Sequence, residues 1–134
     1  FIPYIIETSV GCDRTALVLL VDSYDEEEER VVLRLHPKIA PLKCAVFPLI
    51  NKAELIETAQ KIYNELRIYY NTFYDQSGAI GRRYRRQDEI GTPFCITIDN
   101  DTLTYQIVTI RQRDTMKQDR IASSHIREYL AKFF

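Results

Sequence analysis

Apolar residues follow two different patterns along the last two thirds of the chain, a continuous run and a helical repeat. Residues 43–49 contain a continuously apolar run at 44–47, which is typical of a strand covered on both faces of a sheet. Residues 52–70 place apolar side chains every three to four positions, which predicts an amphipathic helix. The predicted apolar face of this helix consists of Leu55, Ala59, Ile62, Leu66 and Tyr69.

Shorter elements follow the predicted helix. They are strands at residues 72–74, 93–98 and 105–110, a helix at 80–90 that stops at Gly91, and a turn at Asn100 and Asp101. Asp114 or Thr115 is expected to cap a last helix. Its shared apolar face would be Ala122, Ile126, Leu130 and Phe133. The order β-α-β-α-β-β-α indicates a mostly parallel sheet with one antiparallel hairpin and helices on both faces.

The first 40 residues read as a separate unit. A strand over residues 1–9 ends before Gly11, and a helix is predicted over residues 13–24. This helix is apolar nearly all round, so we expect it to be deeply buried. The acidic run at 25–29 predicts a solvated loop, and a short strand follows at 31–35. Prolines near residue 40 mark a connector, which divides the chain into residues 1–40 and 41–134.

Composition excludes several classes of protein. The chain has 134 residues, of which 46% are hydrophobic and 28% charged, as in a globular domain. We expect no membrane span, because no apolar run approaches the roughly 20 residues that one needs. The first residue, Phe1, already lies inside an apolar segment without a secretory leader, which indicates a piece of a longer protein.

Cysteine and histidine usage predicts neither a disulfide framework nor a zinc site. Cys12, Cys44 and Cys95 are odd in number and far apart, so we expect three buried free thiols in a reducing compartment. His36 and His125 have no ligand-like spacing with these cysteines.

Residues 7–14, with the sequence ETSVGCDR, are a first candidate site. Gly11 allows a backbone to approach a flat ligand closely, and Arg14 on the first turn of a helix suits phosphate oxygens. The carboxylate of Glu7 is suited to hold an ammonium group. The structural alternative is that Asp13 caps the helix, Arg14 pairs with Asp13 or Glu7, and Gly11 only turns the chain.

Six arginines form a second candidate site. On a helix, Arg82, Arg83, Arg85 and Arg86 fall within an arc of roughly 160°. Such a face suits phosphates, which favours a contact with RNA. The alternatives are a solvated face paired with Asp88 and Glu89, or a contact with the rest of a larger protein.

The other two arginines lie at a strand end. Arg111 and Arg113 are two positions apart, so they point to one face of the sheet, where planar donors can read or stack on unpaired bases. Asp114, next in the sequence, either accepts from a cytosine amino group or caps the last helix.

Residues 4–14 (YIIETSVGCDR) resemble motif 3 of the class II aminoacyl-tRNA synthetases in its glycyl form, a strand followed by a helix that opens with G-x-D-R. The resemblance implies that Arg14 is catalytic and contacts the γ-phosphate and adenine of ATP. It further implies a glycine pocket lined by Glu7, Thr8, Ser9, Val10 and Gly11. The implied ATP site is lined by Gly11, Cys12, Asp13 and Arg14. Cys12 departs from the more usual apolar residue at its position.

Residues 75–94 (DQSGAIGRRYRRQDEIGTPF) look like the anticodon-binding domain shared by the glycyl, prolyl, threonyl and histidyl enzymes, and residues 108–116 (VTIRQRDTM) match the glycyl form. The resemblance implies an α/β, three-layer domain with a five-stranded mixed sheet and helices on both faces, preceded by a strand–helix remnant of the catalytic domain. It also implies anticodon contacts at Arg111 and Arg113 and supports tRNA contacts at Arg82, Arg83, Arg85 and Arg86.

The implied activity is that of a glycine–tRNA ligase, which joins glycine to tRNA(Gly) through glycyl-adenylate at the expense of ATP with Mg²⁺. The parent is then expected to be a cytoplasmic homodimer, and the chain its C-terminal part, inactive alone because motifs 1 and 2 are not in it. No residue is an obvious Mg²⁺ ligand. The alternatives are a non-catalytic tRNA-binding module of the same fold and a prolyl- or threonyl-type synthetase.

Overall fold

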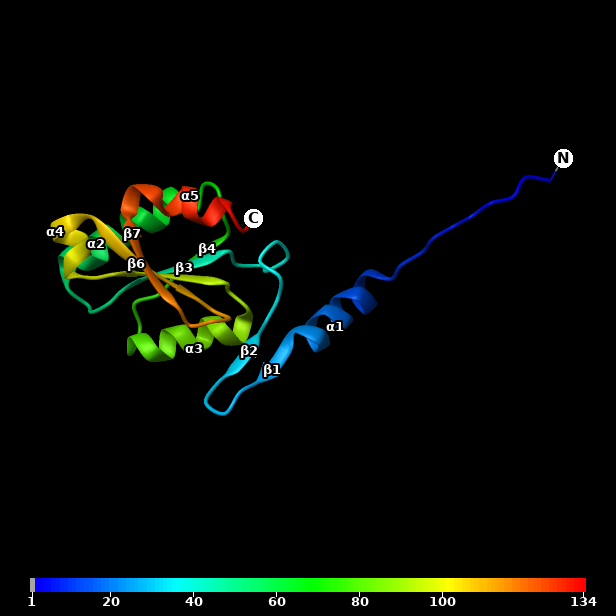
Figure 1. Cartoon of the computed structure of the whole chain (residues 1–134), viewed down its shortest axis with the longest axis horizontal. Coiled ribbons are helices and arrows are strands. Elements are labelled where there is room, and N and C mark those ends of the chain that lie inside the picture. The colour runs from blue at the N-terminus through cyan, green and yellow to red at the C-terminus, as the bar shows by residue number, and fades with distance from the viewer. Residues whose placement is uncertain (1) are drawn as a thin grey trace.

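The centre of the fold is a five-stranded mixed sheet (Figure 1). The structure, a computed structural model, describes residues 2–134. The strands of the sheet are β3 (Cys44–Pro48), β4 (Thr72–Tyr74), β5 (Phe94–Ile98), β6 (Ile107–Gln112) and β7 (Gln118–Ala122). They lie in the order β4-β3-β5-β6-β7, with β3 parallel to both of its neighbours and β6 antiparallel to both of its own. The predicted α/β fold with a mixed sheet is confirmed.

Helices cover both faces of this sheet (Figure 1). One face carries α3 (Ile80–Ile90). The other face carries α2 (Ala53–Leu66), α4 (Asn100–Tyr105), the 3-10 turn η1 (Ser123–His125) and α5 (Ile126–Ala131). The three layers follow from the sequence pattern, because strands that are apolar on both faces need a helix on each.

Strand β3 shows how the core is divided between the two faces. Cys44 and Val46 pack with the helices α2 and α5, whereas Ala45 and Phe47 pack with α3. The ring of Phe47 meets that of Tyr84 edge to face, with 5.9 Å between the centroids. Successive side chains of a strand point to opposite faces, so a run of four apolar residues serves two cores at once.

The first part of the chain departs most from expectation. It contains α1 (Cys12–Ser23) and a hairpin of two antiparallel strands, β1 (Tyr24–Glu26) and β2 (Val31–Leu33). Figure 1 shows α1 and the segment before it extending away from the sheet. The prediction of a deeply buried helix is wrong for this chain, since none of its residues is buried. A helix that is apolar all round needs packing partners on every side, and within residues 2–134 α1 contacts the hairpin at its C-terminal end but is otherwise exposed.

The predicted strand over residues 1–9 is also absent from residues 2–9, whereas Phe1 lies outside the described residues. A strand is stabilised by hydrogen bonds to a neighbouring strand, and none lies beside this segment within residues 2–134. The acidic run, expected to be a loop, instead begins in β1, where Asp25 pairs with Val32.

Two further predictions near the C-terminus are wrong. Asn100 and Asp101 begin α4 rather than forming a turn, because the side chain of Asp99 accepts a hydrogen bond from the Thr102 N–H at 3.0 Å and caps the helix. No helix starts at Asp114 or Thr115. A turn there leads into β7, which pairs with β6, and the last helix begins only at Ile126.

Gly91 ends α3 as predicted. Its φ of 82° is in the left-handed region, and its N–H donates to the Asp88 carbonyl. A Cβ at this position would lie 3.0 Å from the carbonyl oxygen of Leu33 in β2, so the glycine also allows the hairpin to approach the helix end closely.

The completely buried Ile96 offers a test of the core. Ile96→Ala is expected to lower the free energy of unfolding by about 2–5 kcal/mol, because it leaves a cavity between the sheet and its helices. The matched control is Ile68→Ala, at a side chain that is 74% exposed, for which we expect a change within about 0.5 kcal/mol. Urea unfolding followed by circular dichroism measures both, and equal losses would contradict the assigned core.

Candidate functional site

The arginines of α3 divide into an exposed set and a buried one. Arg82, Arg85 and Arg86 are exposed, whereas Arg83 is 2% exposed. Arg83 donates to the backbone carbonyls of Pro48 at 2.6 Å and Leu49 at 3.3 Å, and burial lowers its pKa. The prediction of a four-arginine solvent face is therefore wrong for Arg83, which fastens α3 to the end of β3.

The three exposed arginines line one side of a shallow cleft of about 460 Å³ with Ser77, Gly78 and Glu89. Arg86 is held by the Asp75 carboxylate at 3.0 Å and by the Ser77 carbonyl at 2.9 Å. Arg85 lies 3.8 Å from Glu29 across to the hairpin, and Arg82 makes no ion pair within residues 2–134. Guanidinium groups so placed can fork onto phosphate oxygens.

Arg111 is buried rather than exposed at its strand end. Both of its terminal nitrogens donate to the Asp88 carboxylate, at 2.8 and 2.9 Å, and its guanidinium lies 4.9 Å from the centre of the Tyr84 ring. Burial opposes the charged form, yet Asp88 outweighs it and raises the pKa of Arg111. Arg111 as a whole is 6% exposed. The sequence predicts that this guanidinium is exposed to unpaired bases, whereas the structure buries it against Asp88.

Arg113 is enclosed in the same way. It donates to the carbonyl oxygens of Gly91 and Leu35, each at 2.8 Å, and to the carboxylate of Asp114. Asp114 also pairs with Arg34, and although burial acts in the opposite direction, these arginines lower its pKa. Arg113 thus ties the end of β6 to the segment after β2, and Asp114 caps no helix.

Arg30, in the loop of the hairpin, completes this buried network and was missed by the sequence reasoning. It donates to Asp88 at 3.0 Å, to the Arg113 carbonyl at 2.8 Å and to both carboxylate oxygens of Glu27. The hydrogen bond from Arg30 lowers the pKa of Glu27. Arg30 is far from Asp88 in the sequence, so no spacing rule connects them. The one available signal is an arginine that ends an acidic run.

Residues 7–14 lie along one extended segment that leads into α1. Glu7, Thr8, Ser9 and Val10 are exposed and extended, Gly11 precedes the helix, and Cys12, Asp13 and Arg14 form its first turn. The Thr15 hydroxyl donates to the Gly11 carbonyl at 2.9 Å, and no side chain caps the helix. The end of this segment and the first turns of α1 line a shallow hollow of about 270 Å³.

The cysteines are free, and their predicted burial holds for two of the three. Cys44 and Cys95 are buried, and burial raises the pKa of Cys44 to about 11. Cys12 is exposed at the start of α1, so the expectation is wrong there. Within residues 2–134, no group of three or more His, Cys, Asp or Glu side chains is arranged to hold a metal ion, and no helix has the length and apolar character to cross a membrane.

Comparisons with known proteins agree on one family. The profile of the family described as "Anticodon binding domain" matches residues 43–133. Glycine–tRNA ligases from Borreliella afzelii and Borreliella burgdorferi are 52% and 53% identical over 97% of this chain. One from Caldanaerobacter subterraneus is 60% identical over the same share. The chain spans about 30% of the length of these relatives. The resemblance to the anticodon-binding part of glycyl-tRNA synthetases is confirmed.

The shared carboxylate of Asp88 offers a test of the buried network. Asp88→Asn removes the partner of two buried guanidinium groups, and we expect it to lower the free energy of unfolding by about 3–5 kcal/mol. The control is Asp101→Asn, whose carboxylate pairs with Arg120 at the surface, with an expected loss below about 1 kcal/mol. Urea unfolding at pH 7 compares the two, and a tolerated Asp88→Asn would refute the network's importance.

Proposed function

We propose, on the premise that the chain belongs to the anticodon-binding domain family, that it is the anticodon-binding part of a glycine–tRNA ligase. The match over residues 43–133 establishes the premise. The observation that carries the proposal is the identity of 50–60% to glycine–tRNA ligases over nearly the whole chain, including residues outside that match. The parent protein would join glycine to tRNA(Gly) with ATP, through glycyl-adenylate, as a cytoplasmic homodimer.

The chain's own contribution would be to bind the anticodon arm. The exposed guanidinium groups of Arg82, Arg85 and Arg86 support contacts with RNA phosphates. Arg83, Arg111 and Arg113 would act indirectly, because their guanidinium groups donate to acceptors that join α3 to β3 and β6, and β6 to the segment after β2. We therefore propose that the three exposed arginines contact RNA and that the three buried arginines hold the surrounding elements in place.

Residues 7–14 would serve the parent's amino-acid and ATP sites. Arg14 at the first turn of α1 is suited to bind ATP phosphates, and Glu7 with its neighbours is suited to bind glycine. The exposed apolar side chains of α1 support this, since they need cover from another part of the parent. Residues 2–134 hold no ligand set for Mg²⁺, so we assign no site for it here. The chain alone would be inactive.

Two other functions are less well supported. A separate tRNA-binding module would need only the anticodon-binding domain, whereas the similarity to ligases covers 97% of the chain, well before residue 43. Against a prolyl or threonyl specificity stand the relatives that are 52–60% identical to this chain, which are named glycine–tRNA ligases.

Replacing Arg82, Arg85 and Arg86 together by glutamine tests the RNA surface. We expect weaker binding to an anticodon stem-loop of tRNA(Gly), and a plot of log affinity against log salt that is shallower by about 2–3, because three phosphate contacts are lost. The control removes the same charge elsewhere, at Lys38, Arg67 and Lys132. Fluorescence anisotropy at several salt concentrations measures both, and equal slopes for the two triple variants would exclude this surface.

Arg14→Ala in the full-length parent separates the two proposed sites. Glycine-dependent exchange between ATP and pyrophosphate should fall by a hundredfold or more, on the order of the loss when one charge-stabilising group is removed from an active site, while affinity for tRNA(Gly) stays unchanged. The triple arginine variant should have the opposite effect, with exchange kept and tRNA affinity lowered. An Arg14→Ala enzyme with full exchange activity would refute the ATP role.

A further inference from the structure

An acidic loop lies beside the exposed arginines of α3. It is the turn of the hairpin between β1 and β2, and it carries three consecutive glutamates, Glu27, Glu28 and Glu29. Glu28 and Glu29 are exposed, whereas Glu27 is partly buried. The charge of the acidic loop is opposite to that of the proposed RNA surface, so its position matters for anything that binds there.

The buried network holds the acidic loop in place. The Glu27 N–H donates to the Arg30 carbonyl at 2.8 Å and closes the turn. The guanidinium of Arg30, directly after the loop, donates to Asp88 of α3 at 3.0 Å and to the Arg113 carbonyl at 2.8 Å. Because Glu29 adjoins a residue that is fixed to α3, the acidic loop has a defined position next to that helix.

The three glutamates differ in how far neighbouring cations neutralise them. Glu27 accepts hydrogen bonds from two arginines through both of its carboxylate oxygens. Within residues 2–134, Glu28 makes no ion pair, and Glu29 makes one loose pair, in which its Oε2 lies 3.8 Å from Nη2 of Arg85. The Glu29 side chain is 87% exposed. Two carboxylates of the loop therefore direct most of their charge toward solvent.

Arg85 lies between the acidic loop and the other exposed arginines. On one side it lines the shallow cleft that it shares with Arg82 and Arg86. On its other side it lines a smaller cleft, of about 290 Å³, with the acidic loop and with Met116 from the turn before β7. Within the described chain, the two other arginines of this smaller cleft are already bound to Asp88. Arg85 is thus the arginine that the exposed glutamates can attract.

A phosphate and a carboxylate compete for the same guanidinium hydrogens, because both are anions that accept paired hydrogen bonds from arginine. An exposed ion pair is weak, so a phosphate can displace Glu29 from Arg85. The incoming phosphate also meets repulsion from the free carboxylates, which reaches about 10 Å at 0.1 M salt. Of the two clefts, Arg82 and Arg86 line only the one without glutamates from the loop, so the competition falls on Arg85.

We propose that the acidic loop competes with RNA phosphates for Arg85, an inference that rests on the proposed function of the α3 surface. In the free protein Glu29 pairs with Arg85, and Glu28 adds repulsion toward approaching phosphates. The loop lowers the affinity of this surface for every RNA, because phosphate contacts carry no sequence information. A weaker charge attraction leaves a larger share of binding to contacts that distinguish one RNA from another.

The first test replaces Glu28 and Glu29 together by glutamine in this chain. The affinity for the anticodon stem-loop of tRNA(Gly), and for a stem-loop of unrelated loop sequence, should both rise by about two- to fivefold, the range that one exposed ion pair supports. The plot of log affinity against log salt should become steeper by up to about 1, because Arg85 is then available for one further phosphate. Fluorescence anisotropy measures both quantities.

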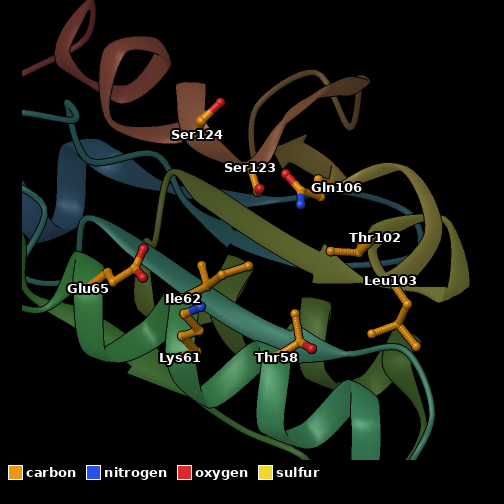
Figure 2. A pocket seen from close by; sticks show the side chains of 9 residues that line it. All are labelled: Thr58, Lys61, Ile62, Glu65, Thr102, Leu103, Gln106, Ser123 and Ser124. Atoms are coloured by element: carbon orange, nitrogen blue, oxygen red, sulfur yellow. The ribbon is translucent and has the colours of Figure 1, made fainter.

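The matched control removes two glutamates from α2, on the opposite face of the sheet. Glu54 is in a surface ion pair with Lys52, and Glu57 makes no ion pair within residues 2–134, which reproduces the charge pattern of the loop. Figure 2 shows this side of the molecule, where side chains of α2 border a separate polar cleft. Glu54→Gln with Glu57→Gln should change the affinity by less than about twofold, since charges beyond a Debye length from the RNA are largely screened.

A double-mutant cycle separates competition for Arg85 from general repulsion. Glu29→Gln should raise the affinity in the wild-type background and have little effect once Arg85→Gln is present. No gain from the loop variant, the same gain from Glu29→Gln in both backgrounds, or an equal gain in the α2 control would overturn the competition while leaving the proposed function intact. A wild-type chain that binds neither stem-loop would overturn both.

Discussion

One buried carboxylate organises the contacts between the two parts of this chain. Asp88 on α3 accepts from Arg111 of the sheet and from Arg30 of the hairpin, and its side chain has no exposed surface. Two positive charges around one negative charge are stable there because carbonyl groups and Glu27 take the remaining guanidinium hydrogens. The hairpin thereby becomes part of the anticodon-binding domain's packing, although it precedes the residues that match the family. The exposed arginines of α3 are positioned by the same helix that this carboxylate anchors.

The parts of the fold that could be predicted are those whose packing partners lie within the chain. The apolar run at 44–47, the period of α2 and the stop at Gly91 depend on local pattern and on a sheet that this sequence itself supplies. The helix α1 was predicted to be buried because its composition demands cover, and residues 2–134 do not contain that cover. Strand β7 was missed because its exposed edge position leaves it polar and hides the alternation that marks a strand.

The candidate site was predictable in its motifs but not in the exposure of its side chains. Four arginines along one helix look alike in a sequence, yet Arg83 faces carbonyl groups at the end of β3 while its neighbours face solvent. Arg111 and Arg113 do lie at a strand end, but they are enclosed by acceptors from α3, from the loop after α3 and from the segment after β2. Burial of an arginine depends on acceptors that are distant in the sequence, so no local pattern reveals it.

The direct passage from α1 into the hairpin has a mechanical consequence. The Arg34 N–H donates to the carbonyl of Ser23, so the end of α1 is bonded into the base of the hairpin. Arg14 lies nine residues from Ser23, or about 14 Å along the helix axis. A tilt of the hairpin by roughly 10° would therefore displace Arg14 by about 2 Å. A small change in the orientation of the hairpin relative to the sheet therefore produces a larger displacement at the N-terminal end of α1.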